Sequence, residues 1–393
     1  MLKKIILKNF KSHKNTPIEF GNLTILCGSN GVGKSSIIQI LLLLRDVFLK
    51  DKSFEILNLK SDAVKIGTVN DAVYEESNID GFECSLSFSS GFDTNFFYEA
   101  KTEDEKTKSF IKLNPEKSNA NPVINFSQLH EVESQFSKFS LFNTHFQYIS
   151  AARSGPLDIY EKDDIIVDIR KQISEKEGKA EYFVHFLDKY QTQEVIKELC
   201  KRDSKNNDLL SQVVLWEKYI FNGANTVIEN NGKLGYSLKY SFDKEYSHVG
   251  KTLNFDAKNV GFGLSYTLPI LVAILSAKPD SLIIIENPEA HLHPNGISRL
   301  CELICIAAQA GIQIIIETHS DHIINGVLVQ SKKNEENGSG INRNNIKIYQ
   351  FDRDISEHCT ISTEIKVEED GVIRFAPKGF FDQIRIDSRY LIS

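Results

Sequence analysis

A glycine-rich string near the start of the chain has the residue types that bind phosphate. Residues 28–35 read Gly-Ser-Asn-Gly-Val-Gly-Lys-Ser, which has the form G-x-x-x-x-G-K-[ST]. Glycines let the backbone N–H groups wrap an anion, Lys34 is placed to reach the β- and γ-phosphates, and Ser35 to hold Mg²⁺. We therefore predict an ATP and Mg²⁺ site. The predicted ligands are Gly28, Ser29, Asn30, Gly31, Val32, Gly33, Lys34, Ser35 and Ser36.

Two later segments carry acids and a histidine at the ends of apolar runs. Residues 281–286 form an apolar strand pattern that ends at Glu286, and Glu289 follows three residues later. Residues 312–317 repeat the pattern and lead into His319. We predict that Glu286 holds Mg²⁺ together with Ser35. Catalysis is assigned to Glu286, Glu289 and His319, with Glu289 orienting or deprotonating a water and His319 contacting the γ-phosphate or that water.

A second glycine-rich turn precedes another apolar helix pattern. Gly261, Gly263 and Ser265 lie in the string Asn-Val-Gly-Phe-Gly-Leu-Ser-Tyr, residues 259–266. A helix N-terminus attracts anions, so these three residues are a second candidate phosphate contact.

The elements that must position these groups follow from periodicity. The pattern at residues 23–27 predicts a strand, and the pattern at 35–44 predicts an apolar helix. A phosphate loop lies between a strand and a helix of this kind. Residues 1–27 are expected to hold two short strands. Strand patterns recur at 82–88, 96–98, 146–149 and 226–255, and 114–122 predict a loop. Helical patterns cover 157–222, including a stripe of Leu209, Val213, Trp216 and Ile220. Predicted helices at 266–277 and 296–309 alternate with predicted strands at 281–286 and 312–317, which is typical of a buried parallel sheet. A polar loop is expected at 332–340. A strand at 346–351 then begins a β-rich tail.

The order of these motifs resembles the ATP-binding-cassette class of ATPases. The chain is most similar to the chromosome-maintenance and recombination ATPases and to AAA-family ATPases of the overcoming-lysogenisation-defect (OLD) kind. The resemblance rests on residues 7–12, on the Glu-Asn-Pro-Glu-Ala-His-Leu-His-Pro string at 286–294, and on residues 148–156 and 377–382. It covers roughly 1–155 and 230–393, and implies an α/β fold with a mixed-sheet ATPase head, an inserted helical module and a small β-rich C-terminal tail.

The resemblance also implies an ATP sandwich between two copies of the chain. The loop of one copy would hold the phosphates, and Gly261, Gly263 and Ser265 of the other would cap them. In place of the family's Asp-Glu pair, this chain has Glu286-Asn287. The family's Glu polarises the attacking water, and an amide cannot act as a base. Either Glu289 or His319 therefore takes part of this role, or hydrolysis is slow. OLD-class nucleases carry a further carboxylate domain, for which the 42 residues after 351 are too few, so a separate protein would supply any nuclease activity.

Composition limits the remaining choices. The net charge of −7 argues against a globally basic nucleic-acid binder, although DNA binding through a local patch stays possible. Six cysteines without a C-x-x-C pair, no secretory leader pattern and no long uncharged apolar run favour a cytoplasmic protein that does not enter the membrane. The expected domains are 1–156 (N-terminal lobe of the ATPase head), 157–225 (helical insertion), 226–345 (C-terminal lobe) and 346–393 (C-terminal segment of unassigned function).

Three functional hypotheses follow. The first is an ATPase that dimerises around ATP and regulates a separate effector or acts on DNA; a role in bacterial anti-phage defence is implied by the resemblance alone. The alternatives are the nucleotide-binding subunit of a membrane transporter and an ATP-gated clamp with negligible hydrolysis.

Overall fold

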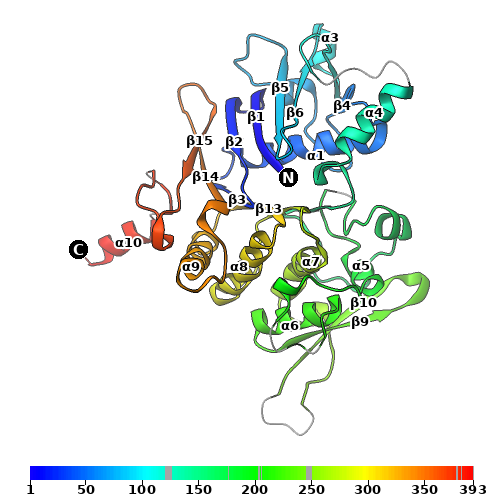
Figure 1. Ribbon diagram of the computed structural model, residues 1–393, viewed down its shortest axis with the longest axis vertical. Coiled ribbons are helices and arrows are strands. Elements are labelled where there is room, and N and C mark those ends of the chain that lie inside the picture. Colours follow the sequence, from blue (N-terminus) through cyan, green and yellow to red (C-terminus); the bar gives the residue numbers. More distant parts are fainter. Residues whose placement is uncertain are drawn as a thin grey trace.

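The centre of the molecule is a six-stranded, mostly parallel sheet (Figure 1). The computed structural model describes residues 1–393 except 120–125, 176, 202–203, 205, 245–249, 378, 382 and 393. In spatial order the strands are β15 (Thr360–Ile365), β14 (Ile346–Arg353), β3 (Leu23–Gly28), β13 (Gln313–Thr318), β12 (Leu282–Glu286) and β8 (Phe146–Ile149). Neighbours from β14 to β8 run parallel, and β15 pairs antiparallel with β14. The carboxyl ends of β3, β12 and β13 therefore meet at one edge of the sheet.

Both faces of this sheet are buried, as expected for parallel strands. Along β12, Ile283 and Ile285 pack into one hydrophobic cluster, while Leu282 and Ile284 pack into a second cluster on the opposite face. This alternation explains why the strand reads as a continuous apolar run in the sequence.

One face is covered by α1 and an antiparallel lobe. Helix α1 (Lys34–Asp51) is apolar around most of its circumference because it lies between two layers. The antiparallel sheet has the order β2 (His13–Glu19), β1 (Leu2–Phe10), β5 (Gly81–Phe88), β6 (Asp93–Glu99), β7 (Phe110–Leu113) and β4 (Ile56–Asn58). The helices of this lobe are α2 (Val69–Ala72), α3 (Glu103–Lys106) and α4 (Phe126–Phe136).

The other face carries the long helices and a three-stranded sheet. The helices are α5 (Phe183–Lys189), α6 (Leu209–Phe221), α7 (Phe262–Ser276), α8 (Pro294–Gln309) and α9 (Asp321–Asn337). The small sheet is β11 (Phe255–Asp256), β10 (Tyr236–Phe242) and β9 (Ala224–Asn230). The predicted stripe of Leu209, Val213, Trp216 and Ile220 is buried along α6.

Several element predictions need correction. Residues 332–337 are not a loop, because α9 continues to Asn337 and ends at Gly338 in a left-handed conformation; Lys and Glu are good helix formers, and Lys332 pairs with Glu336 one turn on. Among its described residues, the region 157–222 is helical in α5, α6 and two short turns, a π-helical turn at Ile165–Ile169 and a 3₁₀ turn at Lys197–Leu199. Residues 1–27 hold three strands rather than two.

The C-terminal segment differs from a small separate β unit. Its first strand, β14, is an interior strand of the central sheet, and the chain ends in a helix, α10 (Gln383–Ile392), which projects from the body (Figure 1). Positions 378 and 382 of the 377–382 string, and the end of the predicted 114–122 loop, lie outside the described residues.

The proposed domain boundaries stay predictions, although packing bears on them. Side chains of α5 and α6 share one hydrophobic cluster with α7 and α8, so the region 157–225 packs as part of the helical layer. No helix in the described part of the chain is long and apolar enough to cross a membrane.

Candidate nucleotide-binding site

The loop between β3 and α1 has the backbone shape that its glycines permit. Gly28, Gly31 and Gly33 have φ of 137°, 77° and 100°, and a side chain at any of them would be strained. Gly33 is the N-cap of α1, so the positive end of the helix dipole faces the loop. Ser29, Asn30 and Gly31 are exposed. In contrast, Val32 and Ser36 are buried, so the side chains of these two predicted ligands face the interior.

Lys34 is held at the mouth of this loop. Its Nζ donates hydrogen bonds to the carbonyl oxygens of Gly28 at 3.0 Å and Ser29 at 2.6 Å, and lies 3.9 Å from the Oε1 atom of Glu317. The side chain is 3% exposed, and burial lowers its pKa. The loop therefore encloses a cation that has carbonyl oxygens, rather than a closely bound carboxylate, as its nearest partners.

Ser35 contacts an acid that the sequence analysis did not select. Its Oγ donates to Oε1 of Glu317 at 2.9 Å, and the other carboxylate oxygen, Oε2, is buried without a hydrogen-bond partner in the described structure. Burial, followed by the charge of Glu286, raises the pKa of Glu317 to about 7. An orphaned carboxylate oxygen beside a hydroxyl is a donor set that suits Mg²⁺, so these residues fit the expected cation.

Glu286 lies next to Glu317 but has different contacts. The two acids are directly paired in the β12–β13 register. Oε1 of Glu286 accepts a hydrogen bond from the Tyr148 hydroxyl at 2.9 Å, and Oε2 accepts one from the backbone N–H of Ala151 at 3.0 Å. Ser35 contacts Glu317 rather than Glu286, because β13, and not β12, is the neighbour of β3. The assignment of Mg²⁺ to Ser35 and Glu286 stays a prediction.

Glu289 joins the acidic segment to the Thr-His-Ser segment. Its Oε1 accepts hydrogen bonds from the Thr318 hydroxyl at 2.8 Å and the backbone N–H of His319 at 3.2 Å, while Oε2 is buried without a partner among the described residues. Burial, followed by the nearby charge of Lys34, lowers the pKa of His319, whose ring is hydrogen-bonded to the Gly28 backbone. The structure therefore brings Glu286, Glu289 and His319 to the same sheet edge as Lys34 and Ser35.

Arg153 fixes the backbone at the end of β12. This buried guanidinium donates to the carbonyl oxygens of Ser150, Glu286, Asn287 and Tyr266 at 2.8–3.1 Å. Burial lowers its pKa to about 10. It ties the acidic strand end to α7 without contacting any carboxylate.

Comparisons with known proteins give the family and the fold of the chain. Residues 23–325, more than half of the chain, match the family described as "AAA domain, putative AbiEii toxin, Type IV TA system". The chain belongs to this AAA family. Residues 341–391 match a second family, described as a protein of unknown function (DUF3696), and the search of curated proteins finds no match.

Solved structures of SMC heads have a related fold. The head domain of Pyrococcus furiosus Smc, crystallised with the C-terminal domain of ScpA, aligns over 99% of both chains with a TM-score of 0.52 and 13% identity. The SMC head of Thermotoga maritima aligns over 93% of this chain and 99% of its own, with a TM-score of 0.46 and 15% identity. The match to the Pyrococcus furiosus head shows that the AAA chain has the fold of an SMC head, as the sequence predicted.

The second glycine-rich helix start of this AAA protein is built differently. Ser265 is fully buried, and its Oγ lies 3.4 Å from the Tyr240 hydroxyl, so in this conformation the hydroxyl cannot reach another subunit. Gly263 packs against a neighbouring backbone, since an added Cβ would lie 2.6 Å from the carbonyl oxygen of His291. The exposed residues of this string are Asn259, Gly261 and Phe262. No hydrogen bond joins Gly261, Gly263 or Ser265 to the phosphate loop in the described part of the chain.

The C-terminal strand of the AAA protein braces the phosphate loop from behind. The Thr360 hydroxyl on β15 donates to the carbonyl of Val32 at 2.9 Å and contacts the Ser12 hydroxyl at 2.7 Å. His13 lies on the same side, with Nε2 2.9 Å from the carbonyl oxygen of Gly33, and burial lowers its pKa to about 4.

Sequence reasoning missed Glu317, Arg153 and Thr360. Glu317 could have been found, because it directly precedes the Thr-His-Ser string at the end of a buried strand. Arg153 and Thr360 gave no such signal, since each acts on backbone atoms that are distant in the sequence.

Proposed function

We propose that this AAA protein binds and hydrolyses ATP with Mg²⁺, and that ATP joins two copies of the chain into a switch that controls a separate partner. The observation that carries the proposal is the intact phosphate loop at the start of α1, with the carboxylates of Glu317, Glu286 and Glu289 gathered around Ser35 and Lys34.

Each residue has a distinct role in this proposal. Lys34 exchanges its carbonyl partners for phosphate oxygens, and the loop N–H groups bind the same anion. Ser35 and Glu317 hold Mg²⁺, and Glu286, on the neighbouring strand β12, lies beside them and adds a second carboxylate near the ion. Bound Mg²⁺ neutralises phosphate charge during transfer of the γ-phosphoryl group to water.

Glu289 and His319 are the proposed groups for water. Both carboxylate oxygens of Glu286 already accept hydrogen bonds, and Asn287 has no basic atom, so neither is suited to take a proton. Glu289 has one oxygen without a hydrogen bond in the described structure, and His319 lies at the loop. If their contribution is small, the same site works as an ATP-gated clamp with slow turnover.

Dimerisation and partners extend the proposal. The exposed start of α7, at Gly261 and Phe262, is the surface that would meet the nucleotide of a second copy. A toxin–antitoxin description of the family, and the ScpA domain bound to the Pyrococcus furiosus Smc head, support a separate protein partner in the cytoplasm. DNA binding and a defence role against phage belong to the same proposal, and any nuclease activity is assigned to that partner.

A mixing experiment tests hydrolysis and the sandwich together. The buried position of Ser265 makes Ser265→Arg unsuitable, because an arginine there would disrupt the core, so Gly261→Arg is used. Lys34→Ala and Gly261→Arg should each be inactive alone and partly active when mixed, because each heterodimer then has one site without a lesion. ATP turnover is measured with and without DNA, and dimer formation by light scattering. A monomer at saturating ATP, or an active Gly261→Arg homodimer, would contradict the sandwich.

A further inference from the structure

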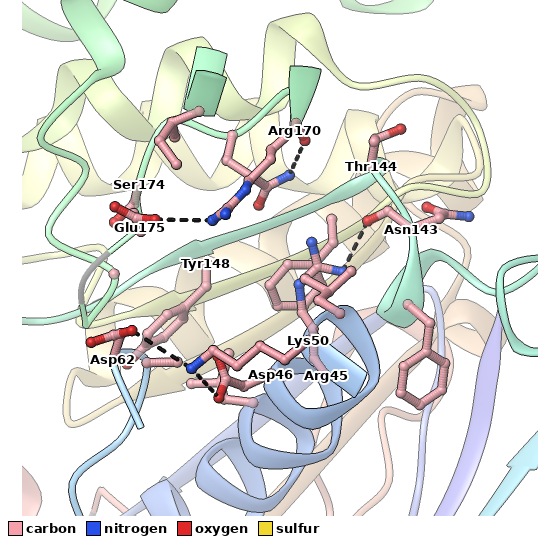
Figure 2. A pocket seen from close by; sticks show the side chains of 18 of the residues that line it. Arg45, Asp46, Lys50, Asp62, Asn143, Thr144, Tyr148, Arg170, Ser174 and Glu175 are labelled. Carbon is pink, nitrogen blue, oxygen red and sulfur yellow. Dashed lines mark hydrogen bonds and ion pairs between the residues drawn. The ribbon is translucent and has the colours of Figure 1, made fainter. Parts of the chain in front are cut away.

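A separate cavity of about 520 Å³ lies beyond the far half of α1, away from the phosphate loop (Figure 2). It is lined by the last turns of α1, by β8 and the turn before it, and by residues 166–178. Its volume is within the range of small-molecule sites. Its walls are part apolar, from side chains such as Leu42, Phe142 and Phe146, and part charged.

Most charges in this cavity are already paired. Lys50 contacts Asp46 at 3.0 Å and Asp62 at 3.6 Å, and Arg170 contacts Glu175 at 2.9 Å; these pairs are drawn in Figure 2. The acids on the walls therefore have cationic partners.

Arg45 is different, because it makes no ion pair with any described residue. Its Nη1 donates to the carbonyl oxygens of Leu141 at 2.7 Å and Asn143 at 2.9 Å, and its guanidinium lies 4.2 Å from the centre of the Phe146 ring. The side chain is only 7% exposed. A buried arginine without an anion is costly, and its remaining N–H donors suit a carboxylate, sulfonate or phosphate.

The cavity is connected to the acids of the nucleotide site through Tyr148. The Tyr148 ring lines the cavity, and its hydroxyl donates to Glu286. Gly178, which also lines the cavity, packs against this ring: an added Cβ would lie 2.5 Å from it, and the Gly178 carbonyl accepts a hydrogen bond from the N–H of Ser150 at 2.9 Å. A molecule that displaces residues 166–178 therefore changes the support of Tyr148.

We propose that this cavity binds a small anion with an apolar or aromatic body, and that occupancy alters nucleotide binding through the Tyr148–Glu286 contact. Arg45 binds the acidic group, and Leu42, Phe142 and Phe146 contact the body. The binding part is independent of the proposed ATPase function; the coupling part rests on it.

Binding is tested with 1-anilinonaphthalene-8-sulfonate, an aromatic anion whose fluorescence rises in apolar surroundings. We expect saturable binding of one molecule per chain. Arg45→Gln should weaken it roughly tenfold or more, through loss of a charged hydrogen-bond donor, and Ala63→Phe should block it by filling the cavity with Arg45 intact. Circular dichroism checks that both variants fold. Lys34→Ala and the distant, exposed Leu234→Gln should bind normally.

The outcomes distinguish specific binding in the cavity from nonspecific binding to apolar surfaces. Loss on Ala63→Phe, together with competition by naphthalene-1-sulfonate but not by neutral naphthalene-1-methanol, supports an anion site. Equal fluorescence from wild type and Ala63→Phe, or equal competition by the neutral compound, overturns it.

Coupling is tested by measuring ATP affinity with and without the saturating probe. Wild type should show at least a threefold difference, and Tyr148→Phe should bind the probe normally but lose the difference. A probe that binds wild type without changing ATP affinity overturns the regulatory part. Failure of wild type to bind ATP at all would refute the proposed function instead, and would leave the binding result standing.

Discussion

The two glycine-rich helix starts of this protein look alike in sequence but use glycine for different reasons. Before α1, Gly28, Gly31 and Gly33 all have positive φ, and the loop holds Lys34 at its mouth. Before α7, Gly261 has an ordinary φ of −62°, and Gly263 is needed because the backbone of His291 lies too close for a side chain. Glycine provides backbone conformation at the first start and close packing at the second.

The α1 start is therefore a preformed anion site, whereas the α7 start is a surface that can add contacts to such a site. The α1 start has a cation, a hydroxyl and a neighbouring carboxylate within contact distance. The α7 start has a buried Ser265 and an exposed apolar Phe262. In the proposed dimer, the second start would therefore contribute backbone N–H groups and shape to the nucleotide of the other copy.

The largest expected effect concerns Glu289, whose carboxylate accepts hydrogen bonds from Thr318 and His319. Glu289→Gln should slow ATP turnover about a hundredfold or more while leaving ATP affinity nearly unchanged, because it removes a base and keeps the size of the side chain. Single-turnover kinetics and calorimetry measure the two quantities. If this variant hydrolyses ATP at the wild-type rate, activation of the attacking water would be assigned to His319 instead.

Lys34→Ala should weaken ATP binding roughly thirty- to hundredfold, through loss of charged hydrogen bonds to phosphate. The matched control is Lys108→Ala, which removes a lysine of the antiparallel lobe that pairs with Asp104. Its affinity, measured by calorimetry, should match wild type. Equal affinity of Lys34→Ala and wild type would exclude the loop as the nucleotide site.

Glu317→Gln should weaken Mg²⁺-dependent ATP binding about tenfold, because Ser35 loses its carboxylate partner. We expect a smaller effect from Glu286→Gln, whose carboxylate is held by Tyr148 and Ala151. Titration of Mg²⁺ at fixed ATP compares the two. A larger effect from Glu286→Gln would restore the metal assignment made from the sequence.

Two alanine substitutions compare the glycines directly. Gly33→Ala should lower the free energy of unfolding by about 1–3 kcal/mol and impair ATP binding, since its φ is 100° and the new Cβ would lie 2.3 Å from the Thr360 hydroxyl. Gly261→Ala should change stability by less than about 0.5 kcal/mol, because nothing lies within 4 Å of its Cβ. Urea unfolding measures both, and similar losses would contradict the distinction.

The last expected effect is a pH dependence of stability without nucleotide. Because the pKa of Glu317 is about 7 in the folded chain and 4.5 in the unfolded one, the folded chain binds more protons between these values. The stabilising contribution of the protonated Glu317 carboxyl group is complete below pH 4.5 and is lost as the pH rises to 7. Glu317→Gln should flatten the decline in urea midpoint between pH 5 and 8.

Glu217 on α6 provides the control for that measurement. It is fully buried, and burial raises its pKa to about 7. Glu217→Gln should also flatten the pH profile, but without weakening Mg²⁺-dependent ATP binding. A flat wild-type profile would show that neither acid keeps its raised pKa.

The sequence by itself determined the phosphate loop, the buried strands and the order of the motifs. These features are local: glycine spacing sets the loop, and continuous apolar runs set strands that are covered on both faces. It also placed Glu289 and His319 correctly at strand ends, where the parallel sheet brings them to the same edge as Lys34.

Tertiary structure decided which groups contact one another. Strand order placed Glu317, and not Glu286, beside Ser35, and no local pattern gives the order of strands in a sheet. Packing buried Ser265 and brought Thr360 from the far end of the chain against the phosphate loop. These outcomes depend on contacts between residues distant in sequence, which are set only when the whole sheet and its covering helices assemble.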